Sequence, residues 1–130
     1  MNKLLIAALL AVFSTSVLAE WTEVGYGDGT TAYADPSTIR KSGNKVKMWN
    51  LFDNTVAEIN KNPSMSYLSQ VSQAEYDCKE ETIRALTFNW YSKNMGAGRV
   101  VHASGAYHEE PHPISPGTLN MLLFKVACGK

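Results

Sequence analysis

Three groups of side chains in this sequence are of a type and spacing that could do chemistry. The first is His108-Glu109-Glu110-Pro111-His112, which matches the H-E-x-x-H pattern of helical zinc sites. Pro111 lies inside the motif, and a proline in a helix interior costs about 3 kcal/mol because it removes a donor and clashes with the preceding turn. No acidic residue follows Glu110 and no histidine follows His112, so a downstream third ligand is missing. The segment is therefore predicted to be an exposed polar loop without a metal, and His108 and His112 remain the candidates if it does bind one.

The second group is Cys78 and Cys128, which are the only cysteines in the sequence. They lie too far apart for the closely spaced pairs of zinc and haem attachment motifs. An even number of cysteines in an exported chain predicts one disulfide, here between Cys78 and Cys128. The alternative is two free buried thiols.

The third group is a concentration of cations across a predicted turn, formed by Arg40, Lys41, Lys45 and Lys47. Four cations at one end of the molecule could bind a sulfated glycan or an acidic protein. The alternative is a solvated hairpin edge, as most surface charges are. The sequence contains no G-x-S-x-G motif and no phosphate-binding glycine loop, so no catalytic residues and no cofactor are predicted.

The N-terminal segment sets the compartment. A positive start at Lys3 precedes an apolar run over residues 4–13 and a small-residue stretch that ends at Ala19. This pattern predicts a signal peptide over residues 1–19, since the apolar run is shorter than the roughly 20 residues of a membrane span. We expect a single domain over residues 20–130, periplasmic or secreted, with no membrane span after cleavage. The 12 basic and 12 acidic residues argue against nucleic-acid binding.

Strand patterns come before a single helix in the sequence. The turn-bounded stretches predict strands at 21–26, 31–35, 45–53, 67–78, 82–92 and 99–104. Asp35-Pro36-Ser37 predicts one helical turn through Ile39, and residues 109–116 predict a proline-rich loop. A final helix is predicted with Ser115 as its N-cap and Gly129 at its end. Its expected apolar face consists of Leu119, Leu122, Leu123 and Val126.

The ordered set of residues resembles the surface-adhesin protein E family over roughly residues 21–128. The resemblance rests on Trp21-x-x-Val24, Tyr33-x-Asp35, Ile39, Val46-x-Met48-Trp49-x-Leu51-x-Asp53, Tyr76-x-Cys78, Arg84, Tyr91-Ser92, Met95-Gly96-x-Gly98, Pro116 and Cys128. It implies an α+β fold, in which a six-stranded antiparallel sheet carries a C-terminal helix on one face, and this agrees with the strand count above. It also implies a non-enzymatic envelope protein.

Three functions follow from these observations as hypotheses. The first is an exported, non-enzymatic binding protein of the adhesion type, with extracellular-matrix or envelope proteins as partners. The second is a periplasmic structural or stress-related protein that has no host ligand. The third is a small hydrolase or metal-dependent enzyme.

Overall fold

The computed structural model describes residues 20–59 and 65–130. The predicted signal peptide, residues 1–19, lies outside these described residues. Within them, no helix has both the length and the apolar composition needed to cross a membrane.

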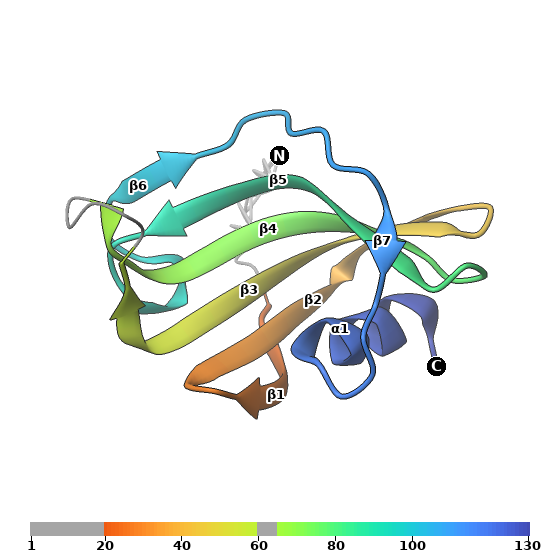
Figure 1. The fold of residues 1–130 in the computed structure, drawn as a ribbon, viewed down its shortest axis with the longest axis horizontal. Coiled ribbons are helices and arrows are strands. Elements are labelled where there is room, and N and C mark those ends of the chain that lie inside the picture. The colour runs from red at the N-terminus through yellow and green to blue at the C-terminus, as the bar shows by residue number, and fades with distance from the viewer. Residues whose placement is uncertain (1–19, 60–64) are drawn as a thin grey trace, which may run out of the picture.

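Most of the described chain forms one antiparallel sheet (Figure 1). Strands β1 to β6 pair with their sequence neighbours in the order β1-β2-β3-β4-β5-β6, and β7 pairs with β5. The predicted antiparallel sheet with one C-terminal helix and one disulfide is therefore confirmed, and β7 is a seventh strand that the sequence did not predict. The elements are β1 (Thr22–Gly27), β2 (Thr30–Ser42), β3 (Lys45–Glu58), β4 (Tyr67–Asp77), β5 (Thr82–Tyr91), the 3-10 turn η2 (Asn94–Gly96), β6 (Val100–Ala103), β7 (His112–Pro113) and α1 (Leu119–Cys128).

The helical turn predicted at Asp35 does not form. Strand β2 continues through this point, with a shift in its register against β3 between Asp35 and Arg40. The Asp35 carboxylate accepts a hydrogen bond from the Ser37 backbone N–H at 3.1 Å, and the Thr38 hydroxyl accepts one from the Trp49 backbone N–H at 2.9 Å. Because side chains replace ladder contacts, the capping residues build a β-bulge here instead of a helix.

The unpredicted strand β7 lies within the proline-rich loop. Its residues His112 and Pro113 pair with Ile83 and Thr82 of β5, and the following Ile114 is buried. Two residues are too few to give an alternating pattern, and a proline is tolerated because this is an edge strand.

Helix α1 begins later than predicted. Its N-cap is Thr118, whose hydroxyl accepts a hydrogen bond from the Met121 backbone N–H at 3.3 Å, so Ser115 is not the cap. The predicted end is confirmed, since Gly129 has the left-handed conformation with a φ of 68°.

The core lies between α1 and one face of the sheet, which we call the front face. Leu123, Phe124 and Ala127 are the buried residues of α1. Leu122 was predicted to be buried but is 37% exposed. The buried face of α1 therefore centres on Leu123, Phe124 and Ala127 instead of the predicted stripe, and Leu122 lies at its margin beside Gly25 of β1. The core cluster consists of Ala34, Val46, Met48, Ala74, Tyr76, Ile83, Ile114, Leu123, Phe124 and Ala127.

The opposite face of the sheet, the back face, is covered at one end by the β5–β6 connection. A Cβ on Gly96 would lie 3.2 Å from Val71 Cγ2 and 3.7 Å from Leu51 Cδ1, so the η2 backbone sits directly on these strands. The Asp53 carboxylate accepts a hydrogen bond from the Met95 backbone N–H at 2.8 Å. The helix and η2 thus leave parts of both faces open.

Candidate binding surfaces

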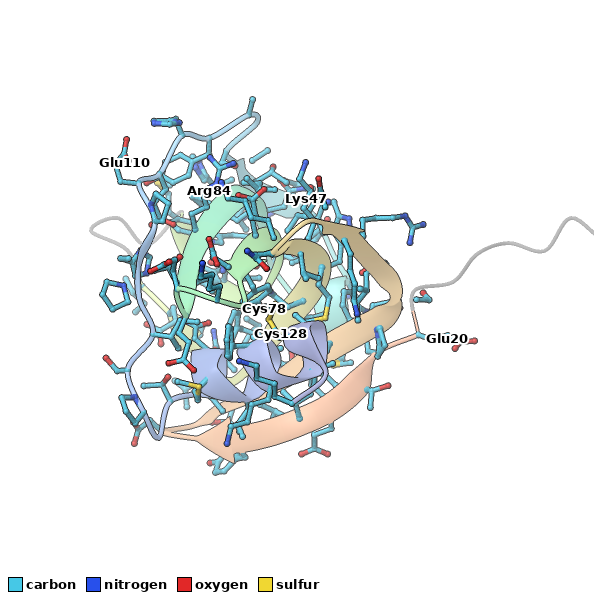
Figure 2. All side chains as sticks on the ribbon, turned by 90° about the vertical axis from the view of Figure 1, so that its right-hand side faces the viewer. Glu20, Lys47, Cys78, Arg84, Glu110 and Cys128 are labelled. Atoms are coloured by element: carbon cyan, nitrogen blue, oxygen red, sulfur yellow. A yellow bond between two sulfur atoms is a disulfide. The ribbon has the colours of Figure 1, made fainter. Side chains whose placement is uncertain are left out.

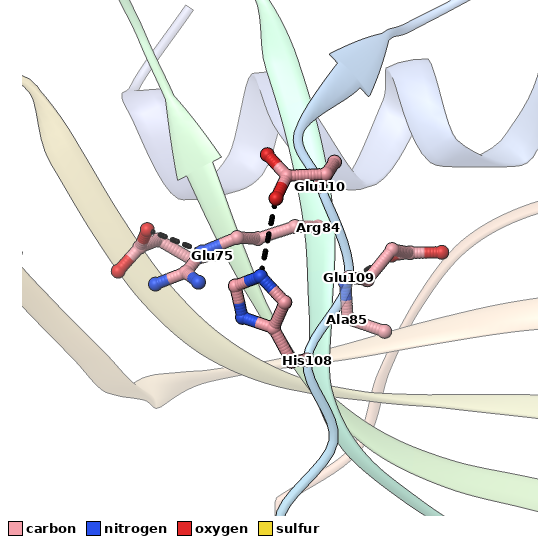
Figure 3. A network of polar contacts seen from close by, with 6 residues as sticks. All are labelled: Glu75, Arg84, Ala85, His108, Glu109 and Glu110. Atoms are coloured by element: carbon pink, nitrogen blue, oxygen red, sulfur yellow. Dashed lines mark hydrogen bonds and ion pairs between the residues drawn. The ribbon is translucent and has the colours of Figure 1, made fainter.

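The H-E-x-x-H segment is not helical and does not form a zinc-protease site. His108 Nε2 and Glu110 Oε1 lie 3.1 Å apart as a solvent-exposed pair, while the Glu109 carboxylate accepts a hydrogen bond from the Ala85 backbone N–H at 2.6 Å (Figure 3). His112 lies in β7. No group of three or more His, Cys, Asp or Glu side chains able to hold a metal ion occurs in the part of the chain that the structure describes.

Glu109 instead completes the outer edge of β5. On the edge facing away from β4, this strand pairs with β7 at one end and with β6 at the other, so the middle of that edge has no partner strand. The Ser104 hydroxyl accepts a hydrogen bond from the Phe88 backbone N–H at 2.9 Å, and the Tyr107 backbone N–H donates to Leu86 O at 3.0 Å. The segment 104–114 therefore covers an edge that would otherwise expose unpaired backbone groups.

The two cysteines form the predicted disulfide, which joins the end of β4 to the last residue of α1 (Figure 2). No cysteine of the described residues is free. The bridge holds the C-terminus of α1 on the front face, and the Lys130 ammonium donates to Cys78 O at 3.2 Å.

The predicted basic residues lie at the β2–β3 hairpin, and three of the four share the back face. Arg40 lies directly opposite Lys47 in the ladder, and Lys41 lies opposite Val46. Since Val46 belongs to the core on the front face and neighbouring residues alternate, Lys45, Lys47 and Arg40 point to the back and Lys41 does not. We call Arg40, Lys45 and Lys47 the basic surface.

The basic surface continues into a mixed-charge row across the sheet. Lys47 lies opposite Glu75, which in turn lies opposite Arg84. The Arg84 Nε and Glu75 Oε1 atoms form an ion pair at 2.9 Å, with Glu75 largely buried (Figure 3). Glu75 is therefore already paired, and none of the ion pairs found among the described residues involves the basic surface.

A second candidate surface lies on the front face, where α1 leaves β3, β4 and β5 uncovered (Figure 1). A central hollow of about 190 Å³ is lined by residues that include Asn50, Phe52, Gln70, Ser72, Phe88 and Glu109. It shares Phe52 and Asn120 with a hollow of about 460 Å³ beside α1, and Phe52 and Gln70 with one of about 220 Å³. We call these three neighbouring hollows the front groove. Sequence reasoning missed it, because no local pattern relates Glu109 to β3 and β4.

Aromatic side chains pack together beside the front groove. Tyr67 stacks on Trp90 with ring centroids 4.5 Å apart, and Trp90 also contacts His102 at 4.9 Å. The ring centroid of Phe88 lies 5.5–5.8 Å from those of Trp90, His102 and Tyr107. Burial, and secondarily the charge of Glu58, raises the pKa of the Tyr67 hydroxyl, so it stays neutral at physiological pH.

Comparisons with known proteins agree with this architecture. The family model described as surface-adhesin protein E matches residues 21–129. Crystal form II of Haemophilus influenzae protein E is similar with a TM-score of 0.65 and 13% sequence identity, over 88% of this chain and 91% of that chain. Another structure of the same H. influenzae protein has a TM-score of 0.63 and 13% identity, over 88% of each chain. No curated protein sequence matches the chain. The family match spans nearly all of the described residues, and the chain therefore belongs to the surface-adhesin protein E family.

Proposed function

We propose that this chain is an exported, non-catalytic binding protein of the adhesion type, whose partners are acidic regions of extracellular-matrix or envelope proteins. Its membership of the surface-adhesin protein E family supports the adhesion role. The predicted signal peptide and the disulfide support an oxidising compartment outside the cytoplasm, that is, the periplasm or the exterior.

The observation that carries the proposal is the direct cross-strand pairing of two cations. Arg40 and Lys47 face each other in the ladder, and both are exposed. Like charges directly opposite on adjacent strands destabilise a sheet. An acidic partner would remove this repulsion and would gain an ion contact with each cation. A purely structural role for the hairpin gives no reason to place the two cations together.

The Arg40 side chain is also held in position. Its Nη1 donates to Ser37 O at 3.2 Å and to Ile39 O at 2.9 Å, both carbonyls of the β2 bulge. A guanidinium has five N–H donors, so most of them remain for a carboxylate or sulfate. The bulge that replaced the predicted helical turn therefore orients one member of the basic surface.

The test is binding of the purified oxidised protein to immobilised heparin and to a panel of extracellular-matrix proteins, with and without the charge reversals Arg40→Glu and Lys47→Glu. Lys93→Glu is the matched control, since it reverses an exposed charge in the η2 connection. We expect saturable binding that weakens with added salt and falls about tenfold or more in each basic-surface variant. Binding that the control weakens equally would refute the assigned surface. An absence of binding would favour a periplasmic structural or stress-related protein that has no host ligand.

A further inference from the structure

The floor of the front groove is polar where the neighbouring floor is apolar. Under α1, the front face of β3 carries Val46 and Met48. Two residues further along the strand stands Asn50, only 2% exposed, and Ser72 lies directly opposite it in β4 at 5% exposed. The Ser72 hydroxyl donates to Asn50 Oδ1, and Asn50 Nδ2 donates weakly to the Tyr76 hydroxyl at 3.5 Å. A side-chain amide has two N–H donors and two lone pairs. One N–H and one lone pair of Asn50 therefore have no partner among the described residues and are available to a ligand.

Two further polar groups that line the central hollow are fixed by contacts within the protein. Gln70 Oε1 accepts a hydrogen bond from Trp90 Nε1 at 2.9 Å, which leaves the Gln70 amino group as a donor. Glu109 Oε2 accepts from the Ala85 backbone N–H, which leaves Oε1 as an acceptor. Donors and acceptors held in place before a ligand arrives lose little conformational entropy when it binds.

The dimensions of the groove favour a ligand made of small repeated units. The central hollow of about 190 Å³ lies below the roughly 300–1,000 Å³ of a site that encloses a whole drug-sized ligand. Further hollows of about 460 and 220 Å³ adjoin it through shared residues. The apolar rings of Phe52 and Phe88 line the central hollow, and Phe52 lines all three. A ring with one apolar face and several hydroxyls matches this mixture of aromatic and amide surfaces.

The strands beneath the groove disfavour a peptide as the ligand. Strands β3 and β4 are interior strands whose backbone groups are paired on both sides, so an extended peptide would find no free sheet edge there. An acidic side chain lines each hollow: Asp28 beside α1, Glu109 in the central hollow and Glu58 in the third. Lys125 is the lysine in the lining, and it lies in the hollow beside α1. This charge disfavours sulfated and uronic-acid glycans.

We infer that the front groove binds a neutral oligosaccharide. One sugar ring occupies the central hollow between Phe52 and Phe88, while Gln70 donates to a hydroxyl and Glu109 accepts from one. This site is separate from the basic surface, which lies on the other face of the sheet, and it holds whether or not that surface binds acidic proteins.

Two isosteric substitutions test the inference, because each keeps the structural hydrogen bond and changes only the remaining atom. Gln70→Glu retains an oxygen for Trp90 but removes the amino donor, and Glu109→Gln retains an oxygen for Ala85 but removes an acceptor. The matched controls are Gln73→Glu, whose residue pairs with Trp49 and Thr87 outside the groove, and Glu110→Gln in the same loop.

In the experiment, the oxidised protein is titrated separately with triacetylchitotriose, cellotriose and maltotriose, and binding is measured by isothermal titration calorimetry. We expect saturable binding of at least one trisaccharide. Gln70→Glu and Glu109→Gln should each raise its Kd about tenfold, because each removes about one hydrogen bond to the sugar. Both controls and Lys47→Glu should bind as the unmodified protein does. The inference is overturned if no trisaccharide binds at millimolar concentration, or if the controls weaken binding as much as the groove variants. Thermal unfolding of each variant establishes that it is folded.

Discussion

Removing the disulfide tests how the C-terminal helix is held on the sheet. The double variant Cys78→Ser/Cys128→Ser removes a covalent link between residues separated by 50 positions. In the chain-entropy description, a cross-link of this span restricts the unfolded chain and stabilises the fold by about 4 kcal/mol. Measured losses for small secreted domains are about 2–5 kcal/mol, a large fraction of the total stability of such a domain.

The native contacts of the helix should survive this change. Leu123 and Phe124 are at most 1% exposed, and burying side chains of this size contributes roughly 1.5–3 kcal/mol each. The Cys78 backbone N–H also donates to Asn44 O at 2.8 Å, independently of the sulfur. We therefore expect the variant to keep α1 docked and to lose stability through its less restricted unfolded state.

The assay is urea unfolding followed by far-ultraviolet circular dichroism and tryptophan fluorescence. With a slope of about 1–2 kcal/mol/M, a loss of 4 kcal/mol lowers the midpoint by about 2 M or more. Reduction of the unmodified protein should give the same midpoint as the double variant, and the variant itself should not respond to a reductant. An unchanged midpoint, or the loss of helical dichroism in native buffer, would refute the reasoning.

Three other substitutions examine separate parts of the structure. Gly25→Val should lower the free energy of unfolding by about 1–3 kcal/mol, because the new side chain would meet Leu122 of α1. The Cβ position of Gly27 is open, so Gly27→Val is the control and should leave the midpoint of thermal unfolding nearly unchanged. Burial raises the pKa of the Tyr76 hydroxyl above its usual 10.0, with a hydrogen bond from an asparagine opposing this. The unfolded state then loses its proton first, so stability falls as the pH rises above about 10, and Tyr76→Phe should flatten that dependence in urea titrations between about pH 8 and 11. Glu109→Ala should lower the free energy of unfolding by about 1–3 kcal/mol, because it leaves the Ala85 backbone N–H of β5 unpaired. Glu110→Ala should lower it by less than about 0.5 kcal/mol, because its pair with His108 is exposed. Equal urea midpoints for the two variants would contradict the role of Glu109 at the edge of β5.

Periodicity and turn chemistry indicated most of the secondary structure. The strand at residues 82–92 alternates apolar and polar residues, and β5 occupies Thr82–Tyr91. The turn at Ser42-Gly43-Asn44 ends one strand and begins the next, as β2 and β3 show. These features are local, since a side chain's face and a glycine's φ depend on immediate neighbours in the chain.

The same local rules failed where distant segments compete for hydrogen bonds. The capping pattern at Asp35 is compatible with a helical turn or with a bulge, and the Trp49 amide of the next strand decided for the bulge. Residues 108–111 of the H-E-x-x-H segment form the predicted loop, but His112 begins the unpredicted strand β7. The use of Glu109 to satisfy the Ala85 amide, however, depends on β5 being an edge strand at that point.

The sequence by itself determined that any intramolecular disulfide must join Cys78 to Cys128, because there are only two cysteines, and it placed the cations across one turn. Only the tertiary structure decided that Arg40 stands directly opposite Lys47, since cross-strand register depends on the whole sheet. It also decided that Gln70 and Glu109 line one hollow. These two residues come from different elements, and their proximity depends on where the segment before α1 crosses the sheet, a long-range arrangement that no local pattern encodes.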